Sequence, residues 1–342
     1  MPRRDLVVVG ASAGGVEALR DLVRDLPGDL PACMLVVLHL PSAAFSALPA
    51  ILARCTDLAV GTAFDGAPLG NGRIYVAPPD RHLLVRDGHI ALGRGPKENG
   101  NRPAIDPLFR SAARWHGPST VGVVLSGTLD DGAAGLLAIT ERGGAAVVQD
   151  PGTASYDGMP SAALRAVPEA KVAGGPDLSV LVATLCGETV AVDPPFPEHV
   201  LEMEAEIARL DERALEEPDR PGRPAAVTCP DCNGAIFEID DGNLVRYRCR
   251  VGHAWSPETL LFEQVEAAEA ALWAAIRTLE EKAALHRKLA GRSQAGRNML
   301  GERYHEEQAA AADESAGVLR DLLRRSLTGL EPAAPPNAKA GG

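Results

Sequence analysis

The stretch Leu6-Val-Val-Val-Gly10-Ala-Ser12-Ala-Gly14-Gly15 decides the fold class of the first half of the chain. Its apolar run, residues 6–9, is rich in valine, as are strands buried on both faces of a parallel sheet. The glycines that follow allow a sharp turn, and a helical pattern begins at Val16. A buried strand that passes through a glycine-rich turn into a helix is the opening unit of a doubly wound α/β fold.

The alternation of strand and helix patterns continues to about residue 192. Further strand patterns lie at Met34–Leu38, Val121–Leu125 and Ala145–Val148. Helical patterns lie between the strands, at Val16–Leu26, Ala47–Arg54, Pro107–Trp115 and Gly135–Arg142. We therefore predict an α/β fold with a doubly wound, mostly parallel sheet. A β-hairpin insertion interrupts it, with short strands at Arg73–Ala77, His82–Arg86 and His89–Leu92 and a turn at Asp87-Gly88.

Changes of composition divide the rest of the chain. Prolines and then acidic helical residues follow the α/β part, next comes a short segment with three cysteines, and long helical patterns follow it. The predicted divisions are the α/β domain 1–192, an acidic linker with a helix 193–226, a zinc-ribbon-like unit 227–257, a helical hairpin or coiled-coil region 258–330 and a disordered tail 331–342.

The overall composition excludes several classes of protein. A net charge of −12 argues against a general nucleic-acid binder, because a phosphate backbone requires a basic surface. No run of 18 or more apolar residues occurs, so we expect no membrane insertion. The apolar run 6–9 is too short for the core of a signal peptide, and no cleavage-type segment follows it. These features predict a cytoplasmic protein.

Ser12 is the first candidate for chemistry, because the turn Gly10-x-Ser12-x-Gly14 projects a serine from the end of a strand. The helix that follows begins close to the serine, and its unpaired N–H groups favour negative charge there. The turn could thus hold a nucleophile, or it could instead bind a phosphate or a dinucleotide. The glycine order does not give Gly-x-Gly-x-x-Gly, which weighs against the dinucleotide alternative.

A nucleophilic serine needs a base and an acid that orients the base. His39 follows the predicted strand Met34–Leu38, and the pair Asp130–Asp131 follows the strand Val121–Leu125. The carboxyl ends of parallel strands meet at one edge of the sheet, so these residues should lie near Ser12. A helix-capping aspartate and a hydrogen-bonded core histidine remain alternatives. The histidines that compete as bases are His82, His89 and His116.

At these residues the chain resembles the catalytic domain of the chemotaxis methylesterases, the CheB family of protein-glutamate methylesterases. Six blocks carry the resemblance in the right order, namely Val9–Gly15, Leu38–Pro41, Val76–Leu83, Arg102–Phe109, Leu125–Ala133 and Gln149–Pro151 leading to Gly158–Pro160. The resemblance implies Ser12 as nucleophile, His39 as base and Asp131, directly before Gly132, as the orienting acid. It implies no cofactor for catalysis.

The resemblance also implies a reaction and its partners. Ser12 would attack a γ-glutamyl methyl ester of a methylated chemoreceptor or similar signalling protein, and methanol would leave. Related family members also deamidate glutamine, and a CheR-type methyltransferase is the functional counterpart. The alternative is a weakly active or inactive scaffold of a sensory complex.

Three residues depart from the family pattern beside the catalytic atoms. Ala13 stands where the family commonly has threonine, and Gly127-Thr128-Leu129 stands where it commonly has Gly-Met-Gly. These departures affect the oxyanion contacts and the shape of the ester pocket that the resemblance implies. Chemotaxis family members usually begin with a phosphorylatable receiver domain, and because only five residues precede the predicted first strand, we expect none here.

The cysteine-bearing unit has the spacing of a metal site. Cys229 and Cys232 form C-x2-C, sixteen residues follow, and Cys249 and His253 form C-x3-H. This spacing fits one tetrahedral zinc ion held by two turns, with no open position for catalysis, so a structural zinc is predicted. The alternative is a reduced, metal-free set of cysteines. The apolar stripe of the helices after Pro257 predicts a hairpin folded on itself or, alternatively, self-association with a second chain.

Overall fold

The computed structural model describes residues 3–40, 46–191, 199–210, 222–241 and 244–329. These residues form two compact units that divide between Leu261 and Phe262. The first unit holds the α/β domain and also the cysteine-bearing segment. The tail predicted at 331–342 lies outside the described residues. Among the residues described, no helix is long and apolar enough to cross a membrane.

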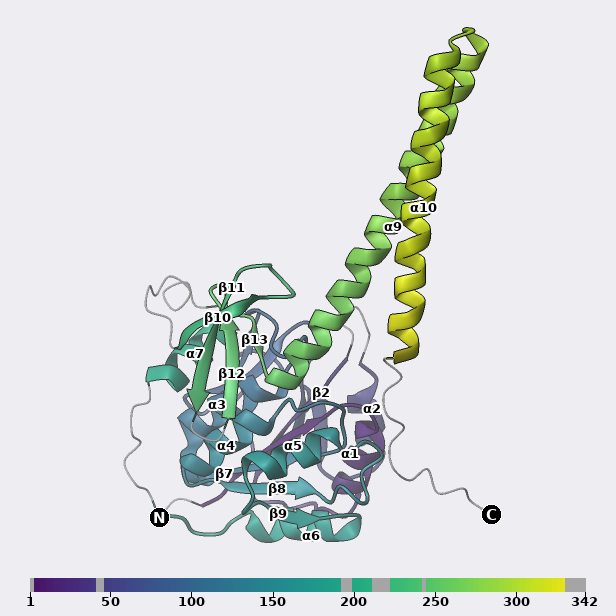
Figure 1. Ribbon diagram of the computed structural model, residues 1–342. Helices are drawn as coiled ribbons and strands as arrows, with labels where there is room; N and C mark the ends of the chain where they lie inside the picture. Colours follow the sequence, from purple (N-terminus) through teal and green to yellow (C-terminus); the bar gives the residue numbers. More distant parts are fainter. Residues whose placement is uncertain (1–2, 41–45, 192–198, 211–221, 242–243, 330–342) are drawn as a thin grey trace. The chain divides into compact units, whose positions relative to one another are not determined.

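A seven-stranded, wholly parallel sheet forms the centre of the first unit, as predicted (Figure 1). Its strands, in spatial order, are β3 (Ala59–Thr62), β4 (Arg73–Val76), β2 (Cys33–Leu38), β1 (Leu6–Ala11), β7 (Thr120–Val124), β8 (Ala145–Gln149) and β9 (Lys171–Ala173). On one side of β1 lie β2, β4 and the edge strand β3, with β4 inserted between β2 and β3, and on the other side β7, β8 and β9 follow in chain order. The switch point of the sheet therefore lies between β1 and β7, where doubly wound proteins form their crevices.

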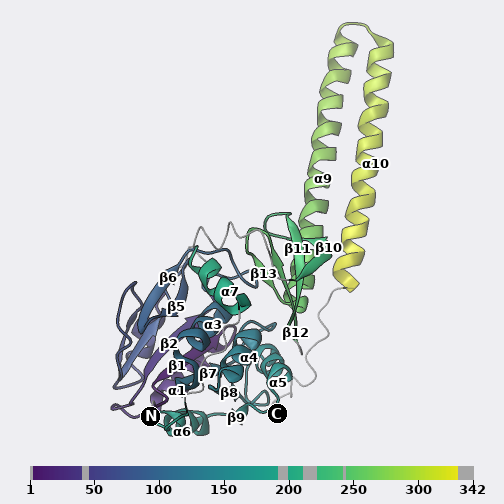
Figure 2. The same cartoon turned by 90° about the vertical axis from the view of Figure 1, so that its left-hand side faces the viewer.

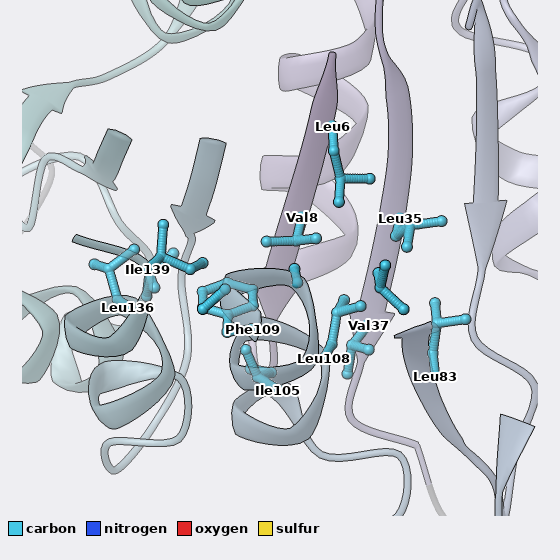
Figure 3. Close-up of a cluster of buried hydrophobic side chains, with 14 of the residues drawn as sticks. Leu6, Val8, Leu35, Val37, Leu83, Ile105, Leu108, Phe109, Leu136 and Ile139 are labelled. Carbon is cyan, nitrogen blue, oxygen red and sulfur yellow. The ribbon is translucent and has the colours of Figure 1, made fainter. Parts of the chain in front are cut away.

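Helices cover both faces of this sheet, and each face has its own apolar core. On one face pack α3 (Ile105–His116), α4 (Ala133–Glu141) and α5 (Gly158–Ala166); on the other pack α1 (Gly15–Arg24), α2 (Leu48–Leu52) and α6 (Pro176–Leu185). Figure 3 shows the first face, where Phe109 of α3 lies among Val8, Leu136 and Ile139. Every residue of β1 and β2 is buried, which explains why these strands read as unbroken apolar runs.

The segment predicted as an inserted hairpin is only partly one. The strands β5 (His82–Arg86) and β6 (His89–Gly93) pair antiparallel around the turn Asp87-Gly88, as predicted. The stretch beginning at Arg73 is instead β4, which pairs parallel with β2 and β3 in the main sheet. The prediction failed there because β3, only partly buried and interrupted by Gly61, has too weak a strand pattern to mark β4 as its neighbour.

The cysteine-bearing segment forms a four-stranded antiparallel sheet, which we call the ribbon. Its strands are β10 (Arg223–Thr228), β11 (Ala235–Asp241), β12 (Leu244–Cys249) and β13 (Ala254–Trp255). Its small core contains Cys229, Ile236, Cys249, Trp255 and Leu260. A helix, α7 (His199–Arg209), precedes it within the predicted linker and packs on α3. Figure 2 shows the ribbon strands from a second side.

Two long helices make up the second unit. Helix α9 (Pro257–Ala295) begins in the first unit and continues into the second, and α10 (Met299–Gly329) runs back beside it. Ion pairs join Arg287 to Asp313 and Glu280 to Arg320, and His286 contacts His305. The helices therefore fold on one another, which is the first of the two predicted arrangements.

Candidate active site

Three neighbouring strands bring the predicted catalytic residues to one edge of the sheet. Ser12 follows β1, His39 follows β2, and Asp131 lies in the loop after β7. β1 lies between β2 and β7 and pairs with both. The site thus occupies the switch point of the sheet, where the loops after adjacent strands diverge to opposite faces and leave a crevice.

The turn after β1 fixes the position of Ser12. The Ser12 N–H donates to the Ser126 carbonyl at 2.9 Å, and the Ser12 carbonyl accepts from the Gly15 N–H at 2.9 Å. Gly14 has a φ of 69°, and a Cβ at this position would lie 2.8 Å from the Ser126 hydroxyl oxygen. A glycine is therefore required both by the left-handed backbone and by the close approach of the loop after β7.

A hydrogen-bonded chain joins the three side chains. His39 Nδ1 lies 3.1 Å from Ser12 Oγ, and His39 Nε2 lies 2.7 Å from Asp131 Oδ2. An ionised carboxylate only accepts, so Nε2 carries the proton and the Nδ1 lone pair faces the serine hydroxyl. The two ring nitrogens are exchanged relative to the chymotrypsin arrangement, in which Nε2 faces the serine. The two arrangements are nevertheless equivalent, because in each of them one imidazole nitrogen faces the serine hydroxyl and the other donates to the aspartate.

Asp131 is held as an anion although it is buried. Its Oδ2 accepts from the Ile105 N–H at 2.7 Å, and its Oδ1 accepts from the Asp106 N–H at 3.2 Å and from Asn99 Nδ2 at 3.1 Å. The two backbone donors belong to the first turn of α3, whose dipole favours an anion. Burial alone would raise the pKa of Asp131, but the hydrogen bond and charge of His39, together with these donors, hold it below its usual value.

A second buried carboxyl, Asp106, lies beside Asp131. Burial and then the negative charge of Asp131 raise the pKa of Asp106 well above its ordinary value. Its Oδ1 accepts from the backbone N–H groups of Gly132 at 3.1 Å and Gly135 at 2.7 Å. Asp106 therefore ties α3 to the loop that carries Asp131. Neither Asp106 nor Asn99 was predicted as a site residue, because their sequence positions show no strand-end pattern and only the folded chain brings them to the acid.

The competing residues contact other groups. His82 is fully buried, with Nε2 2.9 Å from the Pro96 carbonyl; His89 Nδ1 lies 2.8 Å from the Asp87 carbonyl, and His116 Nε2 lies 2.9 Å from Asp5. Asp130 accepts from the hydroxyls of Ser256 and Thr259. Of the candidates that the sequence offered, only His39 and Asp131 form a chain with Ser12.

The residues that depart from the family pattern lie in two segments, the turn after β1 and the loop after β7, that contact each other beside Ser12. The Ala13 carbonyl accepts from the Ser126 hydroxyl at 2.8 Å, which locks the turn after β1 to the loop after β7. Leu129 has a φ of 60° and is 37% exposed. A Cβ on Gly127 would lie 2.9 Å from the Cβ of Ser12 and 2.0 Å from the Met159 sulfur. The loop after β7 therefore passes directly against Ser12 at Gly127.

The four predicted metal ligands lie together in the ribbon. Their ligand atoms all lie within 4.8 Å of one another. Cys232 Sγ is 3.6 Å from Cys249 Sγ, and His253 Nδ1 is 3.5 Å from Cys249 Sγ and 3.7 Å from Cys229 Sγ. Tetrahedral zinc with Zn–S bonds of about 2.3 Å separates two sulfurs by roughly 3.8 Å, so the cluster fits such an ion. It can hold a metal ion.

The surroundings of the cluster also suit a metal. Asp231 Oδ2 lies 3.7 Å from His253 Nε2, the ring nitrogen that does not face the thiols, so a carboxylate lies near the histidine but beyond hydrogen-bond distance. The two turns that carry the ligands close through Asn233 N–H to the Cys229 carbonyl and Gly252 N–H to the Cys249 carbonyl.

Fold and site together define a doubly wound α/β protein with a Ser–His–Asp arrangement at its switch point, the arrangement that serine hydrolases use. The family model of the CheB methylesterases matches residues 7–178. The chain belongs to the CheB methylesterase family.

Curated relatives and a solved structure agree with this membership. A protein-glutamate methylesterase/protein-glutamine glutaminase 5 of Anaeromyxobacter dehalogenans is 42% identical over 164 residues, 47% of this chain and 45% of that protein. A protein of the same description, number 1, from Xanthomonas euvesicatoria is 40% identical over 47% of this chain and 46% of its own length. The crystal structure of the Thermotoga maritima CheB methylesterase catalytic domain matches with a TM-score of 0.51 and 29% identity, covering 54% of this chain and 100% of that one. The chain spans about half the length of the curated relatives it matches.

Proposed function

We propose that this chain is a protein-glutamate methylesterase that hydrolyses γ-glutamyl methyl esters on a chemoreceptor-like protein. The observation that supports it is the continuous chain of hydrogen bonds from Ser12 through His39 to the buried Asp131. The relatives named as methylesterases support the choice of ester. A methyltransferase of the CheR type must make this substrate, because a glutamyl side chain carries no methyl ester until one is added.

The proposed reaction is acyl transfer in two steps. His39 Nδ1 takes the proton of Ser12 Oγ as the oxygen attacks the ester carbonyl, and Asp131 stabilises the imidazolium that forms. The bond to the methoxy group breaks, and His39 returns the proton so that methanol leaves. Water activated by His39 then attacks the acyl-serine, which releases the glutamyl carboxylate and free Ser12. A glutamine side chain would form the same acyl-serine with ammonia as the leaving group.

Replacing the nucleophile tests the proposal. Ser12→Ala should lower methanol release from a methylated receptor fragment by at least about 10³-fold, because no other group can form the acyl intermediate. The matched control is Ser161→Ala, a partly exposed serine on α5. Mass spectrometry of the fragment should show the loss of one methylene per site with the wild type and the control. Hydrolysis by Ser12→Ala at the wild-type rate would refute the assignment.

The proposed cofactor is a single structural zinc ion in the ribbon, held by Cys229, Cys232, Cys249 and His253. The separations of the four ligand atoms and the nearby Asp231 support it. Four protein ligands leave no open position for a substrate, so the ion would stabilise the ribbon and take no part in hydrolysis. Elemental analysis of protein purified without added metal should give about one zinc per chain. The variant Cys232→Ser should abolish this zinc binding. Self-association through α9 and α10 stays a prediction.

A further inference from the structure

Asn99 lies between the triad acid and the ribbon, and all of its side-chain groups are engaged. Its Nδ2 donates to Asp131 Oδ1 at 3.1 Å and to Asp106 Oδ2 at 3.3 Å, while its Oδ1 accepts from the Ser256 N–H at 2.9 Å. The orientation of the amide follows from its partners, because a carboxylate must receive a donor and an N–H must receive an acceptor. The residue is 7% exposed, so each of these bonds forms largely away from water.

The backbone around Asn99 is also paired with the ribbon. The Asn99 N–H donates to the Ala254 carbonyl at 2.8 Å, and the Ala254 N–H donates to the Lys97 carbonyl at 3.4 Å. A parallel bridge joins residues 98 and 254. Asn99 has a φ of 48°, a conformation that asparagine tolerates better than most residues. The ribbon strand β13 thus sets the position of the loop from which Asn99 reaches the acid.

The residues that directly follow the ribbon, Ser256 and the first turn of α9, hold the acid-bearing loop at a second point. Ser256 Oγ and Thr259 Oγ1 both donate to Asp130 Oδ1, at 2.7 and 2.9 Å. Asp130 directly precedes Asp131, so this contact restrains the backbone of the loop that carries the acid. The same Ser256 therefore contacts Asp130 through its hydroxyl and Asn99 through its N–H.

We propose that Asn99 is a positioning residue for Asp131, and that the ribbon orients the catalytic triad through it. The proposal rests on the esterase function proposed above. With Asn99 in place, Asp131 Oδ1 is fixed and Oδ2 is directed at His39 Nε2. Without it, Oδ1 keeps only the Asp106 N–H at 3.2 Å as a donor among the residues that the structure describes, so the carboxylate is held less firmly against His39. His253, a proposed metal ligand, directly precedes Ala254, so the turn that the metal would close also carries the residues that hold Asn99.

The first test removes the amide without straining the backbone. Asn99→Gly keeps the positive φ accessible and deletes the side chain. Its kcat for methanol release should fall by about 10- to 100-fold with KM close to that of the wild type, because misplacement of the triad affects the reaction step more than substrate binding. The matched control is Asn101→Gly in the same loop, whose amide donates to the Asn99 carbonyl and not to a carboxylate. Asn101→Gly should keep most of kcat.

A fluorophosphonate that labels Ser12 separates positioning from unfolding. If Asn99 positions the acid, Asn99→Gly is labelled to the same final stoichiometry as the wild type but more slowly. A structural role alone would lower the final labelled fraction, while the kcat of untreated enzyme, divided by the fraction of chains that can be labelled, stayed at the wild-type value. That second result, or an unchanged kcat, would overturn the proposal.

A second pair of variants tests the ribbon itself. Ser256→Ala removes the hydroxyl that contacts Asp130, and Ser256→Pro also removes the N–H that contacts Asn99. Trp255 lies in β13, and its extended backbone is compatible with a following proline. Ser256→Pro should have a kcat at least about 5-fold below that of Ser256→Ala at equal labelled fraction; equal values would refute the role of the ribbon. If the wild type itself neither releases methanol nor is labelled, the esterase proposal fails as well.

Discussion

Replacing Glu204 by glutamine should destabilise the first unit strongly, because this carboxylate lies at the centre of a buried cluster of charges. Glu204 on α7 has a side chain 1% exposed. It accepts from Arg246 at 2.7 and 2.9 Å and from Arg248 at 3.1 Å, and Arg110 Nε lies 3.2 Å away. Glu98 also forms ion pairs with Arg110 and Arg248. The cluster joins α3, α7, β12 and the loop before Asn99.

The magnitude follows from the charge balance of this cluster. Glu204 contacts all three arginines, so Glu204→Gln removes an anion from three cations, of which Arg110 and Arg248 are buried. Breaking a buried ion pair from one side costs about 3–5 kcal/mol of unfolding free energy, because the remaining charge stays desolvated. The matched control is Glu206→Gln, whose partners Arg114 and Arg209 are partly exposed. That control should cost less than about 1 kcal/mol.

The pH dependence supplies a second measurement. Burial would raise the pKa of Glu204, but the surrounding arginines, Arg246 first, hold it well below its usual value. A carboxyl with a lowered folded-state pKa stabilises the protein above its unfolded-state pKa, and this contribution is lost as the pH falls. Urea unfolding followed by circular dichroism should therefore show a steeper loss of stability in acid for the wild type than for Glu204→Gln. If the variant unfolds at the same urea concentration as Glu206→Gln at neutral pH, the reasoning is wrong.

Two further predictions concern the acid pair and the metal. Because the pKa of Asp106 is raised, the native state keeps a proton that the unfolded chain releases, and wild-type stability should fall as the pH rises from mildly acidic to mildly alkaline. In urea unfolding, Asp106→Asn should flatten this dependence of stability on pH. An unchanged slope would contradict the prediction. Removing metal with a chelator should make the ribbon thiols reactive toward a thiol reagent. The thiols of Cys33 and Cys186 should stay protected, because both are buried in the α/β core. Equal protection of the ribbon thiols before and after chelation would contradict a metal-held ribbon.

Local patterns were sufficient for the parallel sheet and for the triad candidates. Strands β1, β2, β7 and β8 are buried on both faces, so each appears in the sequence as an apolar run that needs no partner to be recognised. Strands β3 and β9 were not predicted, because they are short edge strands with partly exposed residues. Ser12, His39 and Asp131 could be placed on one edge because parallel strands share the direction of their carboxyl ends.

The nucleophile turn, the six blocks of the family resemblance and the spacing of the four metal ligands are all recognisable in the sequence, because each block or ligand pair is a short run of residues. The surroundings of Asp131 became visible only in the folded chain. Asn99, Asp106 and Ser256 come from separate segments, and their contacts with the acid or with one another span up to 157 residues of sequence. Polar contacts over such separations leave no periodicity in the chain, because they depend on how the ribbon, α3 and the loop after β7 pack together.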